Sequence, residues 1–130
     1  MSAIALVEDY LNERNDPLKA VKESLDLCER DRNGSFLNLD RKGAIAAAEL
    51  SQKRYSQGNP IGLWDGVPIG VKDNLALAGL PWTNGMLAYQ DRIADFDASS
   101  LSDLKAVSYT HLRAHETRED LVCRRVREKK

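Results

Sequence analysis

The sequence has 130 residues, of which 42% are hydrophobic and 30% are charged, and its formal net charge is -1. A chain of this length can bury about two thirds of its surface around one core, so we expect one domain rather than two. The near-neutral charge argues against a nucleic-acid or membrane partner. We find no apolar run of roughly 18 residues and no pattern of a secretory leader, so we expect a cytoplasmic protein.

Apolar spacing and capping residues predict the first two helices. Ile4, Val7 and Leu11 recur at helical spacing, so we expect a short amphipathic helix that docks by this stripe. Asp16 followed by Pro17 predicts the start of a second helix, because Asp caps free N–H groups and Pro suits the first helical position. The buried face of this second helix is expected to comprise Leu18, Val21, Leu25 and Cys28.

A third helix is predicted from Asp40 to about Tyr55. The Asn33-Gly34 pair should end the helix before it, and a brief strand is expected at Phe36 to Leu39. The third helix is rich in alanine, whose small side chain and high helix propensity favour close packing against a sheet. A turn is expected at residues 57–60, where Gln-Gly-Asn-Pro ends the helix.

Residues 66–71 read as a strand that enters the interior. Val67, Ile69 and Val71 share one face by the two-residue period, and Lys72 ends the other face. Loop signals follow over residues 79–85, and a last helix capped by Asp97 is expected to include Leu101 and Leu104. Helices that flank buried strands predict an α/β layer structure.

Lys72 is the candidate for chemistry, because it stands where the carboxyl end of a strand meets a loop, the usual place for a site in α/β folds. Asp73 and Asn74 follow directly and add polar groups. They are expected to support the lysine's loop rather than to react. From the pattern alone, a lysine that closes the strand and points to solvent is the favoured interpretation.

Several separated blocks, in one collinear order, resemble the N-terminal third of amidase-signature enzymes. The blocks are residues 37–40, 46–49, 58–62, 65–74 (Asp-Gly-Val-Pro-Ile-Gly-Val-Lys-Asp-Asn), 78–85 and 95–98. The resemblance covers about residues 35–106 and implies the N-terminal helices and first strands of that family's mixed-sheet α/β fold, truncated before its completion. It also changes the interpretation of Lys72 from a surface residue to a catalytic one.

The resemblance implies a catalytic set of a lysine, a serine in a cis peptide and a nucleophilic serine in a Gly/Ser-rich signature, with no cofactor and no metal. The lysine acts as a base, so its pKa of about 10.4 would have to be lowered, for example by burial. Only Lys72 carries over by position, because no Gly/Ser-rich signature is present and Ser99 and Ser100 read as first-turn helix residues. We therefore expect an inactive and poorly folded fragment of an amide hydrolase.

The resemblance implies a small-molecule amide substrate for the full-length enzyme and predicts no oligomeric state. Met86 stands where many relatives have a small or hydroxyl residue, so it does not indicate which amide is preferred. A variant within the family is the A subunit of glutamyl-tRNA(Gln) amidotransferase, although residues 79–85 look more like stand-alone amidases. A small non-catalytic interaction module with a basic tail is the alternative from another class.

Residues 107–130 are expected to be a non-native tail after a partial amidase domain at 1–106. The tail holds seven Lys/Arg against four Asp/Glu, whereas residues 1–106 hold twelve against sixteen. Val107 to Thr117 resembles the translation of a tagmentation adapter from short-read sequencing, and Leu121 to Arg124 can be read from the adjoining adapter. Residues 125–130 match neither piece.

This tail has two functional interpretations. His111 and His115 lie at i and i+4 and, with Cys123, could be taken as metal ligands, but both histidines fall inside the adapter-like segment. A basic arm for nucleic acid would use Arg124, Arg125, Arg127, Lys129 and Lys130. It lacks interleaved aromatic residues and a binding fold. With no Cys-x-x-Cys spacing, Cys28 and Cys123 are expected to be reduced thiols.

Overall fold

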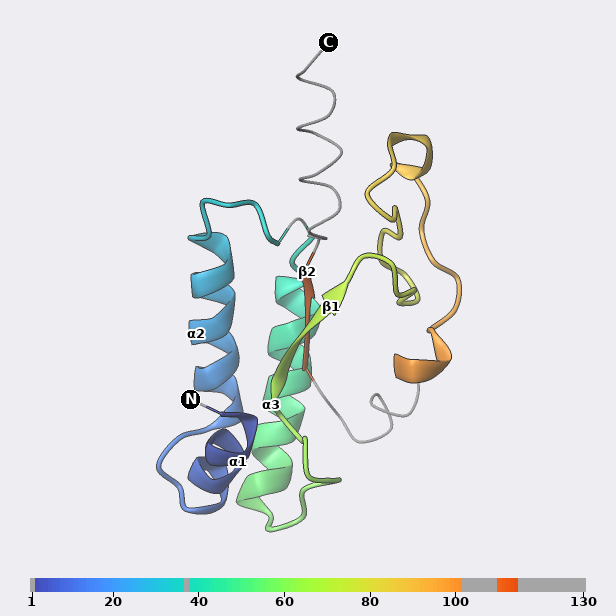
Figure 1. Ribbon diagram of the computed structural model, residues 1–130. Coiled ribbons are helices and arrows are strands. Elements are labelled where there is room, and N and C mark those ends of the chain that lie inside the picture. Colours follow the sequence, from blue (N-terminus) through green and yellow to red (C-terminus); the bar gives the residue numbers. More distant parts are fainter. Residues whose placement is uncertain (1, 37, 102–109, 115–130) are drawn as a thin grey trace.

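The computed structural model describes residues 2–36 and 38–101, and the backbone of residues 110–114. In chain order the elements are α1 (Ala3–Leu11), α2 (Pro17–Glu29), α3 (Arg41–Ser56), β1 (Pro68–Lys72), the 3-10 helix η1 (Leu87–Tyr89) and β2 (Thr110–Ala114). Figure 1 shows the three α-helices on one side of the strand pair and the segment that follows β1 on the other. The chain therefore has the predicted α/β arrangement.

Helices α2 and α3 run antiparallel and form the first part of the core (Figure 1). Val21 and Leu25 of α2 pack with Ala44 and Ala48 of α3, and all four side chains are fully buried. The alanine-rich face thus allows close contact with α2, in addition to the expected contact of α3 with the sheet at β2. The half-buried Leu18 and Cys28 also pack against this cluster, which confirms the predicted face of α2.

The predicted helix starts are confirmed by their caps. The Asp16 side chain accepts a hydrogen bond from the Lys19 amide at 2.8 Å, and the Asp40 side chain accepts one from the Gly43 amide at 2.9 Å. The predicted end of α2 at Asn33-Gly34 was too late, because the helix ends at Glu29.

The brief strand expected over residues 36–39 is not found as a strand at the described positions. A single bridge is assigned at residue 38, and residue 37 lies outside the described residues. Phe36 and Leu39 pack against the α2–α3 cluster instead. Burial against the two helices thus accounts for their apolar character without a strand.

Helix α1 docks by a face that shares only Val7 with the predicted stripe of Ile4, Val7 and Leu11. Ile4 and Leu11 are 61% and 62% exposed, whereas Val7 and Tyr10 are buried. The Tyr10 hydroxyl donates to the Gly66 carbonyl at 3.2 Å, and its ring meets that of Tyr55 edge to face at 5.4 Å. This polar contact and the aromatic pair select the face that carries Tyr10, which the apolar spacing alone did not reveal.

Strands β1 and β2 pair in parallel, with Pro68 opposite Thr110 and Lys72 opposite Ala114. Val67, just before β1, and Val71 within it are buried, which confirms the predicted apolar face. Strand β2 falls within the segment 107–130, whose other residues lie outside the described part of the chain. Helix α3 lies beside β2 on the helical side of the pair.

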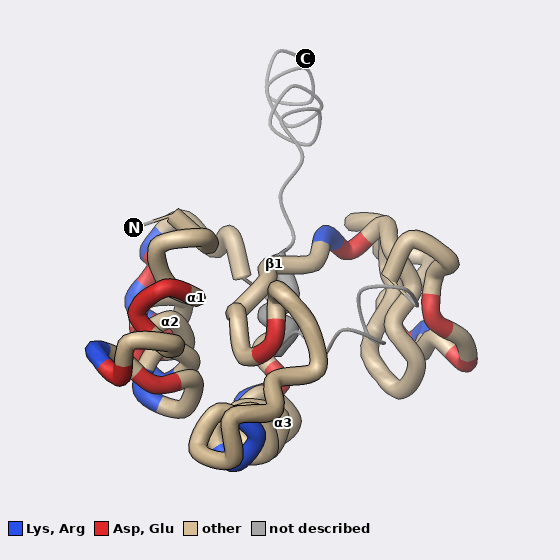
Figure 2. The backbone as a smooth tube through the Cα atoms, turned by 90° about the horizontal axis from the view of Figure 1, so that it is seen from below, with Lys and Arg blue, Asp and Glu red and all other residues tan. Residues whose placement is uncertain are grey.

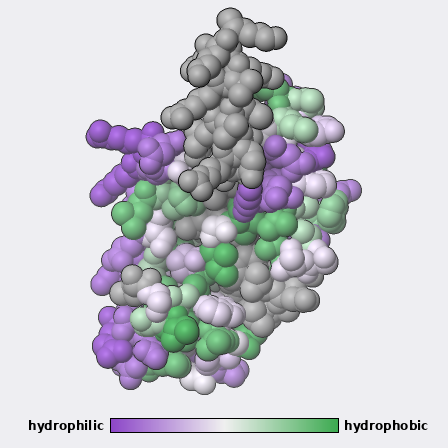
Figure 3. Space-filling view, viewed as in Figure 1, coloured by the Kyte–Doolittle hydropathy of each residue, from purple (hydrophilic) through white to green (hydrophobic). Residues whose placement is uncertain are grey.

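Residues 78–98 form a long excursion that closes on itself. Backbone hydrogen bonds of 2.8 to 3.0 Å join residues 79–82 to residues 92–94, and the Asp97 carboxylate accepts from the Ala78 amide at 2.9 Å. Figure 2 shows that this segment is largely uncharged, in contrast to the helices across β1. Hydrophobic side chains reach the surface on this side of the molecule in Figure 3, and Leu87 is 84% exposed.

After the excursion the chain returns to the core. Residues 99–101 are helical, as predicted, and Leu101 is buried with Val71 and Leu77. The predicted continuation of this helix through Leu104 lies outside the described residues. The return of the chain brings the base of the excursion beside the strand that carries Lys72.

Candidate functional site

Lys72 is the last residue of β1, and its side chain is half-buried. The residues that precede it on the same face are the half-buried Pro68 and the exposed Gly70, which occupy little space. The Lys72 carbonyl accepts a hydrogen bond from the Leu75 amide at 3.0 Å, so the chain turns directly after the strand. The lysine therefore projects from a backbone that strand pairing holds before it and a tight turn holds after it.

Asp73 organises the loop beside the lysine. Its side chain is almost completely buried, and its carboxylate accepts hydrogen bonds from the Thr83 amide at 3.1 Å, the Thr83 hydroxyl and the Gly85 amide at 3.1 Å. Asn84 and Gly85 have φ angles of 52° and 69°, and this left-handed turn aims the Thr83 and Gly85 amides at the Asp73 carboxylate. The expectation that Asp73 supports the lysine's loop is confirmed.

A stacked cluster stiffens the same loop. The Arg92 guanidinium lies 3.7 Å from the centroid of the Trp82 ring and 4.4 Å from that of Tyr89, which is cation–π geometry. The Arg92 Nε also donates to the Trp82 carbonyl at 2.6 Å. The Trp82 indole donates to the Asn74 carbonyl at 3.3 Å, so the stack is tied to the residue that follows Asp73.

The site thus consists of a half-buried lysine at the carboxyl end of a parallel strand, followed by a carboxylate-bound turn. The family model described as Amidase matches residues 19–112. The chain belongs to the amidase family. The family resemblance seen in the sequence is thereby confirmed, and the matched range includes Lys72, Asp73 and the whole excursion.

Curated relatives of this amidase-family chain include the A subunits of glutamyl-tRNA(Gln) amidotransferase from two bacteria. The one from Chlamydia pneumoniae is 36% identical over 72 residues, which cover 55% of this chain and 15% of that protein. The one from Clostridium novyi (strain NT) is 33% identical over 79 residues, which cover 60% of this chain and 16% of that protein. The chain thus matches only about one sixth of the length of these relatives.

Solved amidases share the fold. A bacterial aryl acylamidase of the amidase-signature family aligns with a TM-score of 0.77 and 26% identity, over 88% of this chain and 25% of that one. A crystal structure described as an amidase aligns with a TM-score of 0.79 and 20% identity, over 88% of this chain and 27% of that one. The helices and β1 described above are therefore arranged as in these solved amidases.

The amidase-family chain holds a second buried carboxylate that the sequence analysis did not single out. The Asp65 side chain is 0% exposed, and its carboxylate accepts hydrogen bonds from Arg54 Nε at 2.8 Å and from Arg54 Nη2 at 2.5 Å. Burial alone would raise the pKa of Asp65, but hydrogen bonds from Arg54 and the Ile61 amide, with the Arg54 charge, lower that pKa below its usual value. The pair fixes the loop that enters β1 and lies at the opposite end of the strand from Lys72.

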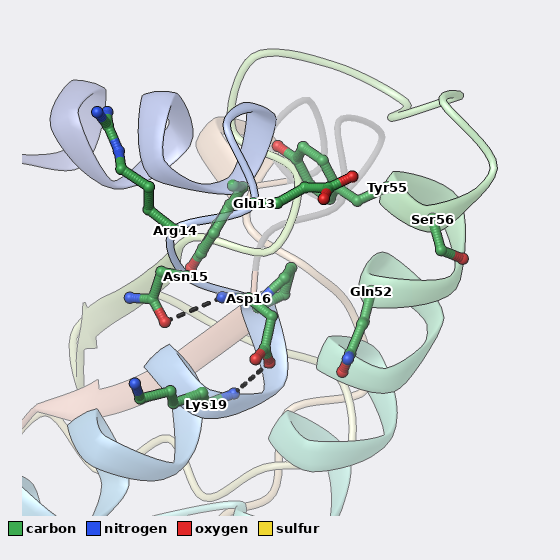
Figure 4. A pocket seen from close by; sticks show the side chains of 10 residues that line it. Glu13, Arg14, Asn15, Asp16, Lys19, Gln52, Tyr55 and Ser56 are labelled. Atoms are coloured by element: carbon green, nitrogen blue, oxygen red, sulfur yellow. Dashed lines mark hydrogen bonds between the residues drawn. The ribbon is translucent and has the colours of Figure 1, made fainter.

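An open cavity of about 310 Å³ lies between the α1–α2 connection and the end of α3 (Figure 4). Tyr10 lines it, and burial is the main cause of the raised pKa of this phenol. Several charges around the cavity are already engaged: Arg14 pairs with Asp9 at 2.8 Å, and Asp16 caps α2. Tyr10 contacts Gly66 at the entry to β1, so the strand's length of roughly 13 Å separates this cavity from Lys72.

The other residues considered in the sequence fall partly outside the described residues. Ser99 and Ser100 begin the helical turn at 99–101, as expected. The side chains of His111, His115 and Cys123 lie outside the described residues. In the part of the chain that the structure describes, no three His, Cys, Asp or Glu side chains group as a metal site, and no helix there has the length and apolar character needed to cross a bilayer.

Proposed function

We propose that this sequence is the lysine-bearing part of an amide hydrolase in which the Lys72 amine is the general base. The observation that carries the proposal is the position of Lys72, half-buried at the carboxyl end of β1 inside the family match. A general base must stand within reach of the group that gives up the proton, and the end of β1 fixes where the Lys72 side chain begins. The substrate class is a small-molecule amide.

The reaction needs two serines that this sequence does not supply at matching positions. The neutral Lys72 amine takes a proton through a bridging serine, and the nucleophilic serine oxygen then bonds to the amide carbon. The C–N bond breaks as the proton passes to the leaving nitrogen, and water hydrolyses the acyl-enzyme. Because the nucleophilic serine belongs to a Gly/Ser-rich signature that this sequence lacks, residues 1–130 alone are expected to have no hydrolase activity.

Substitution of Lys72 in the longer enzyme that we propose to contain residues 1–106 tests this role. Lys72→Ala should lower kcat about 10²- to 10⁴-fold, the usual contribution of a general base. Lys72→Arg should fail as well, because a guanidinium stays protonated. Lys22→Ala, at an exposed lysine of α2, is the matched control. Amide hydrolysis that survives in Lys72→Ala with unchanged kcat would refute the assigned role.

The A subunit of glutamyl-tRNA(Gln) amidotransferase is a second candidate, and the 33 to 36% identity with curated proteins of that name supports it. The 26% identity with an aryl acylamidase supports the hydrolase instead. Amidation of glutamyl-tRNA(Gln) in the presence of the subunits encoded beside the gene would select the amidotransferase A subunit. Hydrolysis of small amides without any partner would select the amide hydrolase.

We also propose that the amidase sequence stops near Ala106 and that the following residues are adapter-derived. The family match extends six residues past this boundary, to residue 112, and residues 110–114 form β2. Resequencing the source DNA across codon 107 decides the matter. A Gly-rich strand and a Gly/Ser signature in frame would support the amidase with a foreign tail. Confirmation of the printed tail would favour the interaction module, provided that removing the tail abolished binding to an acidic partner.

A further inference from the structure

The Asp73 carboxylate is one of three buried polar or charged side chains among the described residues, together with Ser51 and Asp65. It is 3% exposed, although a charged group gains much from water. Thr83 and Gly85 provide hydrogen-bond donors from a turn ten to twelve residues further along the chain. A buried carboxylate that binds a remote turn fixes the separation of the two segments.

The segment fixed in this way includes the lysine's own backbone. Asp73 shares a peptide bond with Lys72, and the next residue, Asn74, is tied to Trp82 by the indole hydrogen bond of 3.3 Å. On the other side, β1 pairs with β2 up to Lys72. If the Thr83–Gly85 turn were released, the chain after Lys72 would lose its anchor, whereas the strand before it would stay paired with β2. Lys72 lies at this boundary.

The geometry points to Asp73 as a positioning residue for the Lys72 amine. This inference rests on the proposed function, in which the amine must meet a serine hydroxyl at hydrogen-bond distance. Asp73 acts through the turn at Thr83–Gly85, which holds the end of β1 and keeps the amine in its half-buried place. A displacement of about 1 Å at a reacting group can cost about a hundredfold in rate, so such an anchor has a functional consequence.

Four variants of the full 130-residue chain separate this role from general stability. Asp73→Asn turns an acceptor oxygen into an NH₂ group that faces N–H donors, and Thr83→Val removes one hydroxyl with little change of shape. Thr83→Ser returns the hydroxyl and should restore the native behaviour. Asp91→Asn is the matched control, because Asp91 is an exposed carboxylate in the same excursion.

Two rates are measured in each variant. Hydrogen exchange of the Gly85 amide reports on the turn. Acylation of Lys72 by a small acid anhydride, which loses its carboxylate as the amide forms, reports on the lysine when it is compared with acylation of exposed Lys22 in the same molecule. In Asp73→Asn and Thr83→Val we expect about tenfold faster exchange and about threefold or more faster relative acylation, since opening of the strand end exposes the amine. Thr83→Ser and Asp91→Asn should match the unmodified chain.

Faster exchange at Gly85 with an unchanged acylation ratio would show that Asp73 only fastens the loop, and the inference would be overturned. Loss of the folded circular dichroism signal in both Asp73→Asn and Thr83→Val would also overturn it, because the effect would then be global. Neither rate requires hydrolase activity. A failure of Lys72→Ala to affect hydrolysis would thus refute the proposed function without being mistaken for a failure of the anchor.

Discussion

Removal of the Arg54 guanidinium should destabilise the chain more than any surface substitution. In Arg54→Met, the Asp65 carboxylate stays 0% exposed but loses donors at 2.8 and 2.5 Å. Breaking a buried pair by removing one partner costs about 3 to 5 kcal/mol, because the remaining charge is uncompensated. For a domain of this size, that free energy corresponds to a fall in Tm of about 10 to 20 °C.

Arg41→Met is the matched control, because Arg41 is also an α3 arginine bound to two acceptors. Its guanidinium lies 3.2 Å from Asp26 and 2.7 Å from Glu29, but all three side chains are 43 to 48% exposed. Exposed pairs contribute about 0 to 1 kcal/mol. The difference in lost stability between Arg54→Met and Arg41→Met therefore reports the effect of burying the partner carboxylate, and not the effect of the number of ion pairs.

Urea unfolding followed by tryptophan fluorescence is the assay, since Trp64 is half-buried next to Asp65 and reports on this region. The double variant Arg54→Met/Asp65→Asn should regain much of the lost stability, because the uncompensated charge is gone. Equal losses in Arg54→Met and Arg41→Met would refute the reasoning. So would a double variant no more stable than Arg54→Met, because the buried charge would then not be the cause.

Two further predictions concern the same region. The pKa of Asp65 is lower in the folded chain than in the unfolded chain. The contribution of Asp65 to stability is therefore complete above the unfolded pKa of about 3.9 and is lost as the pH falls through the folded pKa. In Asp65→Asn, this part of the loss of stability should be absent when unfolding is measured at a series of acid pH values. Gly66 has a φ of 76°, and an added Cβ would lie 2.7 Å from the Pro17 Cβ. Gly66→Ala should therefore cost about 2 kcal/mol or more in denaturant unfolding, whereas Gly58→Ala, with a φ of 67° and nothing within 4 Å, should cost only about 1 kcal/mol. Equal costs at both glycines would show that the contact with Pro17 is not limiting.

Local signals in the sequence predicted the elements that depend on neighbouring residues. Asp16-Pro17 and Asp40 mark helix starts because a cap acts within three residues, and the alternation around Val71 marks a strand because one face is buried. The docking face of α1 was predicted only in part: Val7 is buried as expected, but the face also depends on the contact of Tyr10 with Gly66, 56 residues away. Apolar spacing carries no information about such a remote polar contact.

The site was predictable to a similar extent. The resemblance singled out Lys72, and the order Lys72-Asp73 placed a carboxylate next to it. The donors that Asp73 binds, and the Arg54 that pairs with Asp65, are ten to twelve residues away in the chain. Those partners follow from how two loops fold back, which neither helical nor strand periodicity encodes.

Strand β1 is therefore held at each end by a buried carboxylate. Asp65, paired with Arg54, fixes the loop that enters the strand, and Asp73, bound to the Thr83–Gly85 turn, fixes the loop that leaves it. Each carboxylate loses hydration on burial and regains hydrogen bonds only if its loop keeps one conformation, so each end is conformationally specific. A five-residue strand with a single described neighbour has few ladder hydrogen bonds of its own. The two carboxylates thus supply, from the loops, the rigidity that places Lys72 between them.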